Sequence, residues 1–282
     1  MPTQTSRQTQ RRVGLYSVFL ATVSALIFTS STTVQGGDST ASTPAVIELF
    51  TSHGCSSCPP ADELFSDLIA KNPSIVALEY HVDYWDKLIH GNAGSFKDPF
   101  SSPDYTQRQR AYNQQRLEGR RGVYTPQMIV NGRYVTVGSQ GRYVEHGLQT
   151  AERPNIKLTV EKAPAAVPAA AGEGLRVKLQ DASSAELPRG SKLWLAVFDI
   201  ERETEITGGE NKNLTLVNHH IVREFREIWS PGDPATVTDD DQGLVIDTTV
   251  ALGEGQGCAV LLQPVSPGLS PGPIHAAGYC PL

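Results

Sequence analysis

The sequence predicts an α/β domain over residues 44–152, followed by a smaller all-β, sandwich-like domain over residues 153–282. Two observations support this division. Up to residue 150, the apolar residues alternate between the period of strands and the period of helices. From Pro154 onward, short strand patterns are separated by turn residues, and no helix-period run stands out.

The N-terminal segment, residues 1–37, predicts a secretory signal peptide. Three arginines and no acid precede the mostly apolar run Val13–Phe28, and small residues follow around Val34–Gly37. A membrane anchor is the competing interpretation, but the run is short for a full span and no cluster of positive charge follows it. We therefore expect an exported protein, periplasmic or extracellular, without stable insertion in a membrane after the signal is removed.

The charge balance narrows the class of partner. Removing residues 1–37 takes away three basic residues and no acidic ones. This leaves 21 basic and 30 acidic residues, a net charge of about −9. Nucleic acids and anionic membranes select basic surfaces. The composition therefore disfavours both as partners.

The first domain is expected to run strand, helix, strand, helix, strand, strand, helix. Pro44–Phe50 is typical of a short buried strand, and helical apolar spacing begins after Cys58. Ser102 can cap the second helix, Pro103 suits its first position, and Gly119 ends it. The remaining elements are the strands Ile75–Val82, Val123–Val130 and Arg133–Val137, a hairpin turn at Asn131–Gly132, and a last helix from Gln140 to Thr150.

The second domain is expected to contain only strands. They are Ile156–Glu161, Leu175–Gln180, Lys192–Ile200, Leu214–Trp229, Leu244–Val250, Cys258–Leu262 and Ile274–Tyr279. Cys258 and Cys280 predict a structural disulfide that ties the C-terminus to a strand, because exported chains commonly contain disulfides. Loop-closure entropy suggests a stabilisation of about 3 kcal/mol.

Cys55 and Cys58 predict a redox site. A turn at Thr51–Gly54 separates the first strand from the helix, which places Cys55 at the helix start. The unpaired N–H groups and the positive dipole end there favour a thiolate, which is the attacking form of cysteine. Cys55 is therefore the candidate nucleophile, and Cys58 the resolving thiol that closes a small disulfide with it. His53 can assist if its ring turns inward, although a solvated histidine is the simpler interpretation.

Residues 44–140 resemble the thioredoxin superfamily and, more narrowly, a family of secreted bacterial proteins of unknown function (domain of unknown function 1223). The resemblance rests on the segments Glu48–Ser52, Gly54–Asp62, His81–Trp85, Lys97–Phe100, Arg108–Gln109 with Tyr112, and Tyr124–Met128. The stretch Leu88–Phe96 is longer than this resemblance leads us to expect. The family implies a fold and an export signal but no established reaction.

The resemblance to thioredoxin-type enzymes implies roles for single residues. Pro126 interrupts a strand, where it cannot donate to the ladder, and would form a cis peptide bond that brings Thr125 against the redox cysteines. An edge-strand proline near a bulge is the alternative. Glu48, an acid within an apolar strand, would be the buried proton relay for the second cysteine, with a strand-edge position as an equal alternative.

The end of the second strand is expected to lie beside the cysteines. His81, Trp85 and Tyr124 are therefore the candidate substrate-binding residues. His81, Asp83 and Asp86 lack a recognisable metal-ligand spacing, and the two cysteines lack the second Cys/His pair of a structural zinc site. We expect neither a metal nor another cofactor.

These observations lead to one expected function and two alternatives. The expected function is an exported thiol–disulfide oxidoreductase that acts on protein or small-molecule thiols and disulfides together with a redox partner. The first alternative is a non-catalytic binding or accessory protein in which the disulfide between Cys55 and Cys58 is structural. The second is a metal carrier that uses these cysteines and His81.

Overall fold

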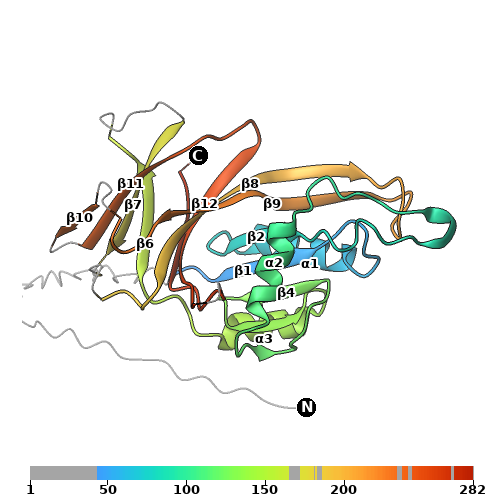
Figure 1. Ribbon diagram of the computed structural model, residues 1–282, viewed down its shortest axis with the longest axis horizontal. Coiled ribbons are helices and arrows are strands. Elements are labelled where there is room, and N and C mark those ends of the chain that lie inside the picture. The colour runs from blue at the N-terminus through green and yellow to red at the C-terminus, as the bar shows by residue number, and fades with distance from the viewer. Residues whose placement is uncertain are drawn as a thin grey trace, which may run out of the picture. The chain divides into compact units, whose positions relative to one another are not determined.

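Nine strands from both halves of the chain join in one mixed sheet (Figure 1). The computed structural model describes residues 43–164, 172–180, 182, 186–233, 237–240, 243–267 and 270–281, so the predicted signal peptide lies outside the described residues. The strand order is β13 (Ala276–Tyr279), β12 (Gln256–Pro264), β8 (Ser191–Glu205), β9 (Thr215–Trp229), β2 (Val76–His81), β1 (Val46–Thr51), β4 (Gln127–Val130), β5 (Tyr134–Val137) and β3 (Glu118–Gly119).

The predicted α/β thioredoxin-like domain followed by a smaller all-β sandwich-like domain is wrong as a description of this fold. Strands dominate the described residues, and β9 lies parallel to β2, pairing Ile221 with Glu79. The large sheet therefore crosses the boundary expected between residues 152 and 153. The physical reason is the free edge of β2: its unpaired N–H and C=O groups are a template for another strand, and β9 is long enough to occupy it.

The helices connect and cover the first strands. Helix α1 (Pro59–Lys71) joins the parallel strands β1 and β2, as parallel neighbours require. Helix α2 (Pro103–Tyr112) begins with the predicted cap, the Ser102 hydroxyl accepting the Asp104 N–H at 3.2 Å. It ends at Tyr112 and not near Gly119, because Glu118–Gly119 pairs with β5 as a strand. A short 3₁₀ turn, η1 (Gly91–Ala93), and helix α3 (Gly141–Thr150) complete the helical elements of the described residues, none of which is long and apolar enough to cross a bilayer.

A second sheet packs against the C-terminal part of the large one. Its order is β10 (Val237–Asp240), β11 (Gly243–Val250), β7 (Glu173–Gln180) and β6 (Lys157–Lys162). Val177 and Leu179 of this sheet share one apolar core with Leu195 and Val260 of the large sheet. The predicted disulfide between Cys258 and Cys280 is present.

The two faces of β1 point to different helices. Leu49 packs in the core with α1, whereas Phe50 packs in the core with α2. Because successive side chains of a strand alternate between faces, Thr51 lies on the α1 face and Glu48 on the α2 face. This alternation decides which buried acid lies near the cysteines.

Candidate functional site

Cys55 and Cys58 lie together in the loop between β1 and α1. Both are free thiols and both are buried. Cys58 is the N-cap residue of α1, and its amide donates to the Cys55 carbonyl at 3.1 Å. The Cys55 amide donates in turn to the Ser52 carbonyl at 3.1 Å. These tight turns hold the two thiols at the N-terminal end of the helix.

The two thiols have opposite pKa shifts. A hydrogen bond from Cys58 is the largest of the effects that lower the pKa of Cys55 to about 6; burial opposes it, and the hydroxyls of Ser57 and Thr125 assist it. Burial raises the pKa of Cys58 well above its ordinary value, and the charges of Cys55 and Asp62 raise it further. Cys55 is therefore the thiol that ionises first.

Asp62 is the buried acid beside the cysteines. It lies one helical turn after Cys58, and it accepts a hydrogen bond from the Thr51 hydroxyl at 2.7 Å. Burial and the charge of Glu79 raise the pKa of Asp62 well above its usual range, against the effect of the Thr51 hydrogen bond. A carboxyl with a raised pKa can accept and return a proton near neutral pH. Its signal in the sequence is the spacing of four residues from Cys58 within a helix, and none of the predictions above rests on this spacing.

Glu48, the expected proton relay, lies on the other face of the sheet. Its carboxylate pairs with the Arg108 guanidinium of α2 at 2.7 Å and accepts a hydrogen bond from the Tyr112 hydroxyl. Arg108 also donates to the side-chain oxygen of Gln263 at 2.8 Å. Glu48 therefore holds α2 to the sheet. Because successive side chains of β1 alternate between its faces, the Glu48 side chain points away from α1 and Cys58.

Thr125 and Trp85 form one wall of the cysteine loop. The Thr125–Pro126 peptide bond is cis. The Trp85 indole N–H donates to the Thr125 hydroxyl at 2.8 Å, and this hydroxyl acts on the pKa of Cys55. Tyr124 is directed elsewhere: its hydroxyl donates to the Arg120 carbonyl at 2.8 Å. Of the expected substrate-binding residues, Trp85 thus lies at the cysteine loop.

The tip of the β8–β9 hairpin, residues 206–214, covers the cysteine loop (Figure 1). The Asn211 side-chain amide donates to the carbonyls of His53 and Cys55, each at 2.9 Å. The Glu210 carboxylate accepts the Ser56 N–H at 2.9 Å. Neither residue could be predicted from the sequence, because no local pattern relates it to a loop about 150 positions earlier.

A second buried polar cluster lies on the α1 face of β2. The His81 ring is held between two carboxylates, with Nδ1 2.7 Å from Asp98 Oδ2 and Nε2 3.0 Å from Glu79 Oε1. Burial lowers the pKa of His81, but the charges and hydrogen bonds of Asp98 and Glu79 outweigh it and raise the pKa to about 10. His81 is fully buried, and both of its ring nitrogens face these carboxylates.

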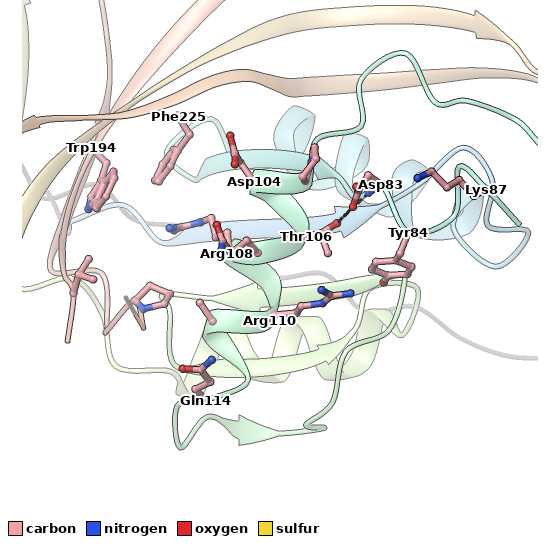
Figure 2. Close-up of a pocket in the computed structure, with 15 residues that line it drawn as sticks. Asp83, Tyr84, Lys87, Asp104, Thr106, Arg108, Arg110, Gln114, Trp194 and Phe225 are labelled. Carbon is pink, nitrogen blue, oxygen red and sulfur yellow. Dashed lines mark hydrogen bonds between the residues drawn. The ribbon is translucent and has the colours of Figure 1, made fainter. Parts of the chain in front are cut away.

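A cavity of about 840 Å³ runs along α2 (Figure 2). Trp194 and Phe225, whose stacked rings are 5.1 Å apart, line one end, and Asp83, Tyr84 and Lys87 line the other. Burial raises the pKa of Tyr84 to about 12, and the charges of the two cysteines contribute. Trp85, the chain neighbour of Tyr84, lies at the cysteine loop through its hydrogen bond to Thr125, so the Tyr84 end of the cavity is the end near this loop.

Fold and site together define a mixed-sheet protein with a buried dithiol at a helix start. The chain matches the family described as "Protein of unknown function (DUF1223)" over residues 46–263, and it belongs to this family. This match confirms the family that the sequence resembled, whereas membership of the thioredoxin superfamily stays a prediction.

Two solved structures resemble this chain. Protein AGR_C_4864 from Agrobacterium tumefaciens is 27% identical over 85% of this chain and 94% of its own, with a TM-score of 0.61. HBP35 of Porphyromonas gingivalis is 15% identical over 84% of this chain and 74% of its own, with a TM-score of 0.51, and supports the fold alone. No curated protein matches the chain.

Proposed function

We propose that this protein is an exported thiol–disulfide oxidoreductase. The observation that supports it most is the grouping of two free thiols at a helix start with a buried carboxyl, Asp62, one turn further along. Thr51 links the two groups, since its hydroxyl bonds to Asp62 and also affects the pKa of Cys58. The N-terminal segment, residues 1–37, supports export.

The exchange proceeds in two steps. The Cys55 thiolate attacks one sulfur of a substrate disulfide, that S–S bond breaks, and the other substrate sulfur leaves as a thiolate that takes a proton from water. Asp62 then accepts the proton of Cys58, whose thiolate attacks Cys55 Sγ. A 55–58 disulfide forms and the second substrate sulfur leaves. Two electrons have passed to the substrate, and a dithiol partner restores the reduced pair; the reverse sequence oxidises a dithiol.

Access to Cys55 requires the hairpin tip to move. The contacts of Asn211 and Glu210 must break before a substrate sulfur reaches the thiolate. The complete burial of both cysteines also favours a second candidate function, an accessory protein whose cysteines never exchange with a partner.

The reduction potential of the 55–58 pair in the full chain separates the two candidates. We expect equilibration with glutathione at a potential above about −270 mV, and a trapped mixed disulfide in Cys58→Ser but not in Cys55→Ser. A potential below about −300 mV without any trapped adduct contradicts the oxidoreductase and supports the accessory protein.

A further inference from the structure

We propose that His53, His81 and Asp98 form a binding site for a divalent transition-metal ion, and that zinc fits this site best. One ligand atom from each residue lies within 4.8 Å of the others, and all three side chains are buried. Two imidazoles and a carboxylate are a ligand set that zinc uses in proteins. The proposal is independent of the redox function, since neither Cys55 nor Cys58 is among the ligands.

His53 has a buried nitrogen without a hydrogen bond from the described residues. The Asn218 side-chain amide donates an N–H to Glu79 at 2.6 Å. Its oxygen therefore faces His53 Nε2 at 2.9 Å and accepts a hydrogen bond from the Nε2–H. The Nδ1 atom of His53 then carries no proton and presents a lone pair. It lies 3.4 Å from Asp98 Oδ1. Two acceptors that face each other in a dry interior repel. A cation between them replaces this repulsion by attraction.

Both histidines are held in the way that metal-binding histidines are held. Their Nε2 atoms have outer partners, Glu79 Oε1 at 3.0 Å for His81 and the Asn218 oxygen at 2.9 Å for His53. A metal-binding histidine nearly always donates its other ring N–H to a carboxylate, a carbonyl or water. Here this arrangement leaves the Nδ1 atoms of both rings beside the Asp98 carboxylate.

The ion replaces a short hydrogen bond between two of the ligands. His81 Nδ1 and Asp98 Oδ2 are 2.7 Å apart, and a divalent ion bound by both atoms takes the place of this contact. Asp98 is already oriented for this, because its two oxygens accept the backbone N–H groups of His53 at 2.8 Å and Phe100 at 3.0 Å.

The surroundings favour zinc over ferrous iron. The rings of Phe96 and Phe100 lie 6.1 and 5.6 Å from the His53 ring. The ligand side chains are 0% exposed. Iron sites with two histidines and one carboxylate keep open positions for oxygen, whereas zinc has no redox chemistry and needs one fourth ligand, a water molecule, beside the three side chains.

Metal analysis of the full chain, purified without chelator or metal-affinity resin, tests the proposal. We expect about one zinc ion per chain, its removal by a strong chelator, and a higher unfolding temperature when Zn²⁺ is restored. A chelated protein that takes up neither Zn²⁺ nor Co²⁺, with no change in unfolding temperature, overturns the proposal.

Variants identify the ligands. His53→Gln and Asp98→Asn are each expected to lose stoichiometric binding, and Glu79→Gln to weaken it by about 10- to 100-fold as an outer partner. His220→Gln is the matched control: this half-buried histidine bonds to the Ala77 carbonyl outside the cluster and should leave binding unchanged.

Cobalt substitution keeps the test decisive if a ligand variant does not fold. The Co²⁺-loaded wild-type chain should show bands of nitrogen and oxygen ligation without thiolate-to-cobalt charge transfer. The double variant Cys55→Ser/Cys58→Ser should give the same spectrum. Thiolate bands, or loss of cobalt binding in the cysteine variant, would place the ion on the cysteines and overturn the assignment to His53, His81 and Asp98.

Discussion

Two buried acids lie on opposite faces of β1 and differ in what they face. Glu48 meets a permanent cation, Arg108, and further hydrogen-bond donors. Asp62 accepts a hydrogen bond from the Thr51 hydroxyl, and burial and the repelling charge of Glu79 raise its pKa. Glu48 is held in an ion pair with Arg108, whereas the raised pKa of Asp62 allows it to exchange a proton. The partner of a buried acid, and not burial alone, therefore indicates its role.

The largest effect, a loss in the free energy of unfolding, is expected for Glu48→Gln. This change leaves Arg108, whose side chain is 10% exposed, as a buried charge without its carboxylate. Breaking a buried ion pair from one side costs roughly 3–5 kcal/mol. Urea unfolding of the full chain measures it, with the exposed Glu63→Gln of α1 as the control. A loss below about 1 kcal/mol would show that the pair does not hold α2 to the sheet.

Asp62→Asn should instead slow the thiol–disulfide exchange while the fold stays intact. The amide cannot accept the Cys58 proton, so release of the mixed disulfide should slow by roughly 100-fold. Stopped-flow release from a substrate thiol attached to Cys55 measures this step. Asp67→Asn, on the exposed side of the same helix, is the control. Equal rates for Asp62→Asn and wild type would exclude Asp62 as the proton acceptor.

The pH dependence of Cys55 alkylation tests the lowered pKa of this thiol, beside which Asp62 lies. With a pKa of about 6 for Cys55, the thiolate fraction and the rate of reaction with iodoacetamide rise through pH 6 and level off above it. The rate should therefore fall roughly tenfold from pH 7 to pH 5. Because the hydrogen bond from Cys58 is the main cause, Cys58→Ala should move the midpoint upward. A wild-type midpoint near 8.5, the value of a free cysteine, would contradict this assignment.

The smallest effect, on the alkylation rate of Cys55, is expected for a change at the hairpin tip. Asn211→Ala removes two hydrogen bonds to the cysteine loop, each of which contributes about 0.5–1.5 kcal/mol. At the low end of this range for each bond, about 1 kcal/mol in all, alkylation of Cys55 at neutral pH should become roughly 5-fold faster. Lys212→Ala, an exposed change at the same tip, is the control. Unchanged alkylation in Asn211→Ala would show that the tip does not limit access.

Local signals predicted the parts of the fold that depend on near neighbours. Ser102 and Pro103 start α2 because a cap and a proline act within one turn. The pairing of β9 with β2 joins residues that are 142 positions apart, Glu79 and Ile221. Strand periodicity shows which face of a strand is apolar but not which strand lies beside it. The nine-stranded sheet could not be found in this way.

The residues of the candidate site show the same difference between local motifs and contacts between distant parts of the chain. The positions of Cys55, Cys58 and Thr125 follow from motifs of a few residues, and Asp62 could have been found from its helical spacing. Asn218 contacts His53 only because β9 joins the large sheet. No pattern along the chain brings this residue to the cysteine loop.

The hairpin tip also sets an order in time. Asn211 follows Cys55 by 156 positions, and chains are made from the N-terminus at about 5–20 residues per second. For roughly 10–30 s of synthesis, the two thiols exist on a nascent chain whose cover has not been made. During this interval the pair is open to the oxidants and reductants that the growing chain meets, before the finished molecule closes over it.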